Sequence, residues 1–256
     1  MAEQSELAPG QTILEHLGEF RIRLTWAAAG LLVGVVISFA FTEQLLNILI
    51  EPYGERLQTL SPTEGIQTYF RVALLAGVTL AMPWILYQLW RFISPGLHEN
   101  ERKYVYVFVP SATLLFLLGV AFAWFVLLPS AINFLSTFMP EIFSAEWTSQ
   151  EYIGFATSFI LWMGIAFQLP LIIYFLARFG ILSSSMLKEH WRIAVVGIAV
   201  IAAVVTPSID PVTMLLTMLP LVILYILSIF LASLGYRQFE KSMALREDTV
   251  DTTTAD

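Results

Sequence analysis

Long apolar runs alternate with short polar segments along this chain, and six of the runs carry no charged residue. A bilayer core of ~30 Å takes about 20 helical residues to cross, which sets the length expected of a span. The runs lack the strict alternation of a membrane β-strand, and a helix satisfies its own backbone hydrogen bonds in lipid. The pattern therefore predicts an all-α membrane protein with six transmembrane helices. The six runs are Leu24–Phe41, Val72–Trp90, Val105–Leu128, Tyr152–Ala177, Ile193–Val205 and Val212–Leu234.

The fifth run is short for a membrane span. At 1.5 Å per residue, Ile193–Val205 reaches only about 20 Å. The segment Thr206–Pro211 contains two prolines and then turns the chain back. Three interpretations remain open: the hairpin stops within the far leaflet, the bilayer is locally thinned, or flanking residues complete the span.

Basic residues mark one side of the membrane. Of the 13 Lys and Arg residues, only Arg56 and Arg71 fall on the side that holds the loop Pro129–Glu151. The other eleven flank the opposite ends of the runs, and the positive-inside rule assigns that side, with both chain ends, to the cytoplasm. The eleven are Arg21, Arg23, Arg91, Arg102, Lys103, Arg178, Lys188, Arg192, Arg237, Lys241 and Arg246.

The expected domain organisation follows from these runs. Residues 1–10 are polar and acidic and predict a disordered tail, residues 11–238 a single six-helix transmembrane domain, and residues 239–256 a flexible cytoplasmic tail. The polar N-terminus lacks the basic start and apolar core of a secretory signal, and it has little room for a plastid transit segment.

Composition supports a membrane protein and argues against several functions. The chain is 57% hydrophobic and 13% charged, whereas soluble domains carry about 25% charged residues. A net charge of -7 argues against general nucleic-acid binding, and the absence of cysteine excludes disulfides. The sequence has no phosphate-binding loop and no zinc-protease or serine-hydrolase motif, so we expect no enzyme, metal or cofactor.

Polar residues are rare within the predicted spans. Ion-coupled carriers usually keep ionisable residues near the midplane, and these spans have none. Gln168 is the deepest strongly polar residue and precedes Pro170 by two positions. It suits either an interhelical hydrogen bond or the lining of a working cavity. In the first span, Trp26, Gly30, Gly34 and Ser38 recur every four residues, and small residues at this spacing allow close helix contact.

Two clusters on the basic side suit the recognition of a cationic ligand. In His16–Leu24, apolar residues at helical spacing predict an amphipathic helix that leads into the first span. Its polar face carries Glu19, which is also spaced to pair with Arg23 four residues later. The second cluster, Tyr87–Lys103, ends a span with aromatic residues and continues through Ser94-Pro95-Gly96 into an acidic-then-basic segment. Arginine makes bidentate, charge-assisted contacts with carboxylates such as these.

At these clusters the sequence resembles the TatC family, the receptor core of the twin-arginine protein translocase. The family opening H-L-x-E-L-R-x-R-L reads His16-Leu17-Gly18-Glu19-Phe20-Arg21-Ile22-Arg23-Leu24, with Phe20 in place of the usual Leu. A second signature is similar to Pro83–Trp90 followed by Phe92, Pro95-Gly96-Leu97 and Glu101-Arg102-Lys103. The resemblance extends from about Leu14 to Tyr236.

The resemblance implies a receptor that binds twin-arginine signal peptides of folded cargo on the cytoplasmic face. It also implies assembly with single-span TatA/TatB-type partners in a multimeric complex, driven by the proton-motive force, in the cytoplasmic membrane of a prokaryote. By this resemblance Glu19 and Glu101 hold the arginine pair, with Phe92 beside them. Arg21 orients Glu19 or meets a lipid phosphate, and His16 completes the candidate signal-peptide site.

The resemblance also implies a concave bundle whose last two helices are short. Partner helices of the family dock on the fifth span and the last hairpin, which makes Thr206, Asp210 and Thr213 candidates for contact. The family often has Glu where this chain has Gln168, so a polar contact within the membrane cavity is expected of that residue.

Other classes of function remain open from the residues alone. A small-solute secondary transporter or channel subunit is the main alternative, although a charge within a span or an internal repeat would be expected of it. A structural membrane scaffold would not need Glu19 and Glu101. An intramembrane enzyme needs convergent catalytic groups at depth, which the sequence does not provide.

Overall fold

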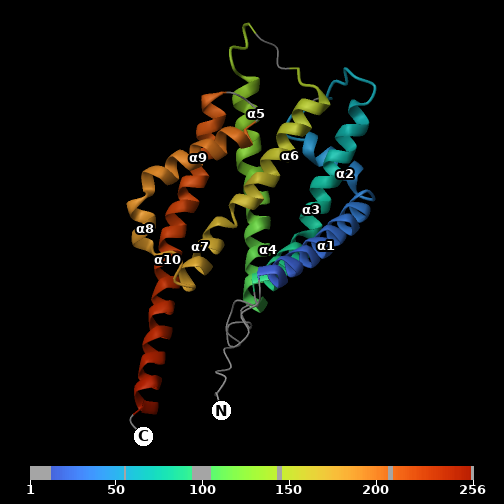
Figure 1. The fold of residues 1–256 in the computed structure, drawn as a ribbon. Coiled ribbons are helices and arrows are strands. Elements are labelled where there is room, and N and C mark those ends of the chain that lie inside the picture. Colours follow the sequence, from blue (N-terminus) through green and yellow to red (C-terminus); the bar gives the residue numbers. More distant parts are fainter. Residues whose placement is uncertain (1–12, 55, 94–104, 143–145, 207–209, 255–256) are drawn as a thin grey trace. The chain divides into compact units, whose positions relative to one another are not determined.

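The structure is a computed structural model that describes residues 13–54, 56–93, 105–142, 146–206 and 210–254 (Figure 1). Over these residues it is helical, and the one β pairing is an isolated bridge between Gln58 and Thr148. The helices are α1 Ile13–Ser38, α2 Thr42–Ile50, α3 Glu64–Ile93, α4 Val105–Phe122, α5 Leu128–Ser136, α6 Ser149–Ala166, α7 Leu169–Arg178, α8 Ser184–Glu189, α9 Trp191–Val205 and α10 Pro211–Thr254, with a π-helical segment η3 Ala123–Leu127.

Five helical segments of the described chain are long and apolar enough to cross a membrane, which confirms an all-helical, multi-pass membrane protein. They are Leu17–Ser38, Glu64–Ile93, Tyr106–Ser136, Ser149–Arg178 and Pro211–Lys241. The predicted fifth run corresponds to α9, which has only 15 residues and is short as expected.

The expectation that the last helix is also short is wrong. Helix α10 has 44 residues and continues well beyond Leu234, where the apolar run ends. The residues from Tyr236 to Asp248 include no glycine or proline and are rich in good helix formers such as Arg, Gln, Glu, Lys and Leu. Gly235 directly follows the apolar run, where a glycine often ends a helix, but here it serves close contact with α7, since a Cβ on it would lie 2.6 Å from the carbonyl oxygen of Tyr174. The helix formers after it then continue α10.

The chain forms two compact units. The first comprises Met1–Thr42 and Ala73–Thr113, and the second comprises Glu43–Val72 and Leu114–Asp256. In the first unit, α1 packs on α3 through glycines. A Cβ on Gly34 would lie 2.6 Å from the carbonyl oxygen of Gly77, and one on Gly77 would lie 2.7 Å from Cα of Val35. The small-residue pattern of α1 therefore serves close contact with α3.

Two hydrogen bonds hold the same pair of helices together. The hydroxyl of Ser38, which is fully buried, donates to the carbonyl oxygen of Ala73 at 2.6 Å. The indole Nε1 of Trp84 donates to the carbonyl oxygen of Trp26 at 2.9 Å, and its ring occupies the space where Gly30 has no side chain. Helix α4 joins this unit through Trp90, whose ring lies 4.7 Å from that of Phe108. These contacts place the start of α1 beside the end of α3.

In the second unit, two prolines reshape long helical segments. The π-helical segment η3 joins α4 to α5, and the N–H of Leu128 donates to the carbonyl oxygen of Ala123, five residues earlier. Pro129 follows directly, lacks an N–H and would crowd the preceding turn of an α-helix, so a widened turn accommodates it. Pro170 has a similar effect, because the helix breaks at Phe167 and Gln168 between α6 and α7.

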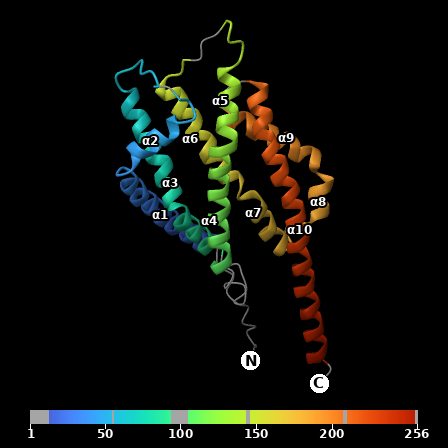
Figure 2. The ribbon, with the colours of Figure 1, turned by 180° about the vertical axis from the view of Figure 1, so that it is seen from behind.

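Helices α7, α8 and α9 pack against α10 (Figure 1 and Figure 2). One apolar cluster joins Ile198 and Ala202 of α9 to Leu221 and Leu224 of α10. A second joins α7 to α10 through Ile173, Ala177 and Ala232. The short helix α8 is fastened by the hydroxyl of Tyr225, which donates to the carbonyl oxygen of Leu187 at 2.6 Å.

Glu64, the first residue of α3, ties two loops of the second unit together. It is only 3% exposed. Its Oε2 accepts the backbone N–H groups of Leu60 and Ser61 at 2.9 and 3.3 Å. Its Oε1 accepts the hydroxyl of Ser149 at 3.0 Å and the N–H of Gln150 at 2.8 Å. One carboxylate thus satisfies four donors at the start of α3 and the start of α6.

We expect Glu64→Ala to loosen this connection, because three backbone N–H groups and the buried hydroxyl of Ser149 lose their acceptor. Limited proteolysis of the detergent-purified protein should cleave the segment 56–63 roughly tenfold faster than in the parent chain. The exposed Glu141 provides the matched control, and Glu141→Ala should leave the rate unchanged. Equal cleavage of both variants would show that Glu64 does not hold the loop.

Candidate functional site

The start of α1 carries the carboxylate that the sequence singles out. Glu19 lies one turn before Arg23, whose Nη2 donates to Glu19 Oε1 at 3.2 Å. The predicted i,i+4 pair therefore forms, but not on a fully solvated face, because each side chain is only 19% exposed. A carboxylate has about four lone-pair sites, so the bond from Arg23 leaves acceptor capacity for further donors.

Two aromatic rings join this part of α1 to the end of α3. The rings of Phe20 and Phe92 meet edge to face, with centroids 5.4 Å apart and planes at 63°. Phe92 therefore lies next to the helix that carries Glu19. Phe20 replaces the Leu of the family motif, and an aromatic residue is what makes this edge-to-face contact possible.

An apolar pocket of about 150 Å³ lies between α1 and α3 at this position. Its walls combine residues of both helices, and one of them, Gln88, is a polar side chain that is 4% exposed. No sequence pattern predicted this pocket, and Gln88 lies in the cluster Tyr87–Lys103 without a role of its own predicted for it. The lining residues are Phe20, Arg23, Leu24, Ala27, Ile85, Gln88, Leu89 and Phe92.

The remaining residues predicted for this site are described in part or not at all. Arg21 lies on α1 and is exposed, and its carbonyl oxygen accepts the hydroxyl of Thr25 at 2.8 Å. His16 belongs to the first turn and a half of α1, and its side chain lies outside the described part of the structure. Glu101 lies outside the described residues, so its place beside Glu19 stays a prediction.

Gln168 lies at the break between α6 and α7 and is 6% exposed. Its N–H donates to the carbonyl oxygen of Ile165, and its own carbonyl accepts the N–H of Ile172, each at 3.0 Å. The adjacent Phe167 packs against the apolar cluster of α9 and α10. The structure therefore places this amide inside the second unit, at a proline-induced kink.

Three predicted contact residues flank the turn between α9 and α10. Thr206, 5% exposed, ends α9 with its hydroxyl donating to the carbonyl oxygen of Ala202 at 2.8 Å. Asp210 precedes Pro211 and caps α10, because its Oδ1 accepts the N–H of Thr213 at 2.6 Å. Thr213 is fully buried, and its hydroxyl has no hydrogen-bond partner among the described residues.

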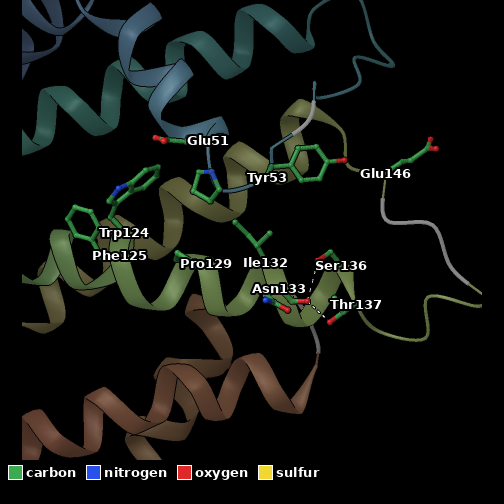
Figure 3. A pocket seen from close by; sticks show the side chains of 11 residues that line it. Glu51, Tyr53, Trp124, Phe125, Pro129, Ile132, Asn133, Ser136, Thr137 and Glu146 are labelled. Carbon is green, nitrogen blue, oxygen red and sulfur yellow. Dashed lines mark hydrogen bonds between the residues drawn. The ribbon is translucent and has the colours of Figure 1, made fainter.

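A cavity of about 970 Å³ lies in the second unit, and the sequence analysis did not anticipate it. Figure 3 shows Trp124, Pro129 and Ser136 along one helical segment, with Glu51 and Tyr53 across from them. The wall of this cavity carries aromatic and hydroxyl side chains, and it includes the π-helical segment that accommodates Pro129. The sequence predicted that the third run ends at Leu128 and that a loop begins at Pro129, whereas the helix continues as α5 to Ser136. A proline at this position by itself indicates only a helix end or a distorted helix.

Fold and site together define a multi-pass helical membrane protein with a carboxylate and an aromatic pair at one end of two packed helices. The family model for "Sec-independent protein translocase protein (TatC)" matches residues 15–220. The chain belongs to the TatC family and is thus a component of a protein translocase.

Curated relatives and solved structures agree with this assignment. The chain is 38% identical to the Sec-independent protein translocase protein TatC of Helicobacter pylori strain J99, over 86% of this chain and 88% of the relative. It is 37% identical to the TatC protein of Deinococcus radiodurans, over 86% and 85% of the two chains. A crystal structure of the twin-arginine translocase receptor TatC matches with a TM-score of 0.79 at 35% identity, covering 86% of this chain and 99% of that one.

Proposed function

We propose that this protein is the membrane-embedded receptor of a twin-arginine translocase. Glu19 binds the paired arginines of signal peptides on folded cargo, together with Glu101. The observation that carries this proposal is a partly buried carboxylate with free acceptor capacity, held next to the Phe20–Phe92 pair. Partial burial strengthens an ionic contact over its value in water, and the aromatic rings offer a surface on which a guanidinium stacks.

Arg23 holds Glu19 in place before the ligand arrives. It orients one carboxylate oxygen and leaves the rest of the acceptor capacity to the signal peptide. The exposed Arg21 contacts a lipid phosphate or supports Glu19, and His16 lies on the same helix, within one turn of Glu19. The expected binding weakens with salt to the extent that the carboxylate stays accessible to water.

The proposed topology places both chain ends, and this site, in the cytoplasm. Eleven of the 13 basic residues support this orientation. The short helix α9 provides the sixth crossing, so that the chain crosses a prokaryotic cytoplasmic membrane six times. In this arrangement the carboxylates face the compartment in which cargo proteins fold.

Single-span TatA/TatB-type proteins are the proposed partners, in a complex driven by the proton-motive force. Thr206 and Thr213 are the proposed contact residues, and Asp210 contributes by fixing the start of α10. Gln168 is proposed to make a polar contact in the membrane cavity. Its amide is not ionisable, so we assign no proton transfer to it.

Photo-cross-linking tests whether the site touches the signal peptide. We expect a photoreactive amino acid at position 92 to give an adduct with a peptide carrying Arg-Arg, because Phe92 lies beside the Glu19 helix. The yield should fall at least about tenfold when the peptide carries Gln-Gln, which removes both charges. Position 230 on α10, where Phe230 is 59% exposed, serves as the control. Equal adducts at both positions would contradict the proposal.

A further inference from the structure

Arg71 of α3 is a cation that takes no part in the proposed signal-peptide site. It lies seven residues after Glu64, the first residue of α3, and therefore about 10 Å along the helix. It is exposed, and it is one of two basic residues on the side of the membrane predicted to hold the loop Pro129–Glu151. Among the described residues, no carboxylate forms an ion pair with it. This part of the chain thus offers the cation no counter-charge.

The guanidinium of Arg71 lies against α6. Its Nη1 donates to the carbonyl oxygen of Gln150 at 3.5 Å, which is long for a hydrogen bond. Gly154, one turn further along α6, is buried, and a Cβ there would clash with the same nitrogen. The missing side chain of Gly154 thus leaves room for the guanidinium at this position. Arginine has five N–H donors, so one long bond leaves most of them available to a ligand.

A pocket of about 380 Å³ adjoins this guanidinium within the second unit. Two of its polar side chains already have acceptors. The hydroxyl of Thr68 donates to the carbonyl oxygen of Glu64 at 2.8 Å. The amide of Gln67 donates to the hydroxyl oxygen of Thr63 at 3.3 Å. Arg71 is therefore the main donor that the pocket presents to a ligand. The lining residues are Ile66, Gln67, Thr68, Phe70, Arg71 and Gln150.

The apolar side chains of this pocket face outward. Ile66 and Phe70 lie one helical turn apart on α3 and are 62% and 57% exposed. They belong to a segment that is long and apolar enough to cross a membrane, so they are suited to contact with acyl chains. A guanidinium in hydrocarbon is costly unless it is paired or reaches the interface. Helical side chains lean toward the N-terminus of their helix, which directs Arg71 toward the headgroups at this end of the span.

A phospholipid offers a partner both for the guanidinium and for the apolar side chains. Its phosphate oxygens accept the paired donors of an arginine, and its acyl chains suit the exposed Ile66 and Phe70. We propose that Arg71, placed over Gly154, binds the phosphate of a phospholipid in the leaflet opposite the cytoplasm, with an acyl chain along α3. The bound lipid contacts the first turns of α3 and α6, which Glu64 also joins.

Lipid binding to the detergent-purified protein tests this site. Phosphatidylglycerol is added to the delipidated protein, and native mass spectrometry measures the affinity of the first bound lipid. We expect Arg71→Gln to lower this affinity about tenfold, because the charge-assisted bonds to the phosphate are lost. Arg56→Gln removes an exposed cation on the same predicted side but outside the pocket, and it should leave the affinity unchanged. Equal affinities of the two variants would overturn the proposal.

Two simpler probes separate a phospholipid from other ligands. Diacylglycerol lacks the phosphate, and glycerophosphoglycerol has the same phosphodiester but no acyl chains. We expect each to bind at least about tenfold more weakly than phosphatidylglycerol, because each makes only one of the two kinds of contact. Equal affinity for diacylglycerol would reduce the site to an apolar surface, and equal affinity for glycerophosphoglycerol would make it a site for a free anion. Either result would overturn phospholipid binding.

Gly154→Ala tests the position of the guanidinium without removing its charge. The added methyl group displaces the end of a flexible side chain, so the unfolding temperature without lipid should stay the same or rise. Affinity for phosphatidylglycerol should fall roughly threefold, because the arginine fork loses its orientation. Gly197→Ala is the control, since a Cβ there meets nothing within 4 Å, and it should leave the lipid affinity unchanged. Equal affinities of these two variants would refute the role of Gly154.

Two further measurements separate lipid binding from other roles of Arg71. A ligand stabilises the folded state that binds it, so phosphatidylglycerol should raise the unfolding temperature of the parent chain more than that of Arg71→Gln. If the substitution lowers this temperature equally with and without lipid, Arg71 serves the fold and the proposal is refuted. Unchanged lipid affinity with loss of co-purified partner proteins would assign this face to another membrane protein instead. The site shares no residue with the proposed signal-peptide site, so Arg71→Gln should bind Arg-Arg peptides normally, and either proposal can fail alone.

Discussion

Replacing Glu19 with alanine is expected to abolish export of twin-arginine cargo while the protein remains folded in the membrane. The change removes the carboxylate that we propose binds the arginine pair, and it leaves Arg23 without the partner that it holds at 3.2 Å. Hydrogen bonds to charged groups contribute about 1.5–3 kcal/mol, so affinity for the signal peptide should fall roughly 10–150-fold. Export of a cargo protein in cells and peptide binding to the purified protein measure the two effects.

Three comparisons make the Glu19 result specific. Glu101→Ala should have the same effect if both carboxylates hold the arginine pair. Glu189→Ala, at an exposed position of α8, should leave export normal. Gln168→Ala should reduce export less than either change in the site, because it removes a polar contact and no charge. Normal export in Glu19→Ala and Glu101→Ala would refute the assignment of the site.

Adding one methyl group at Gly77 is expected to destabilise the protein and impair peptide binding together. A Cβ at this position would lie 2.7 Å from Cα and 2.8 Å from the backbone nitrogen of Val35, so α1 and α3 must move apart. Overpacking of this kind costs about 1–3 kcal/mol. Because the same two helices carry Glu19 and Phe92, their separation should also weaken peptide binding at the proposed signal-peptide site.

Gly65 on the same helix provides the control for Gly77. A Cβ on Gly65 would meet nothing within 4 Å, and alanine is a better helix former than glycine. Thermal unfolding in detergent should therefore show a lower midpoint for Gly77→Ala and an unchanged or higher one for Gly65→Ala. Similar midpoints for both variants would mean that the close contact of α1 and α3 does not stabilise the fold.

The apolar pattern predicted most of the helices, because a segment that crosses a hydrocarbon layer must be a long run of apolar residues, and such a run is visible in the sequence. The sequence also predicted that the small residues of α1 contact another helix and that Gln168 is buried. The length of α10 was missed, since its continuation depends on helix propensity after the apolar run has ended. The π-helical segment before Pro129 was missed because a proline indicates distortion without specifying its form.

The site was predictable only where neighbours in sequence are neighbours in space. The pair Glu19–Arg23 follows from helical spacing. In contrast, Gln88 lines the pocket beside Phe92 only because α3 brings it to α1, and no local pattern marks an amide whose acceptor stays unpaired. Glu64 is similar, since its partners Ser149 and Gln150 follow it by 85 and 86 residues.

The most direct test of the receptor function is the binding of the detergent-purified protein to two signal peptides that differ only in Arg-Arg against Lys-Lys. Lysine keeps the charge but lacks the planar fork of donors that a carboxylate accepts in pairs. The proposed site predicts a clear preference for Arg-Arg that disappears in Glu19→Ala. Equal affinity for the two peptides, or a preference that survives in Glu19→Ala, would contradict it.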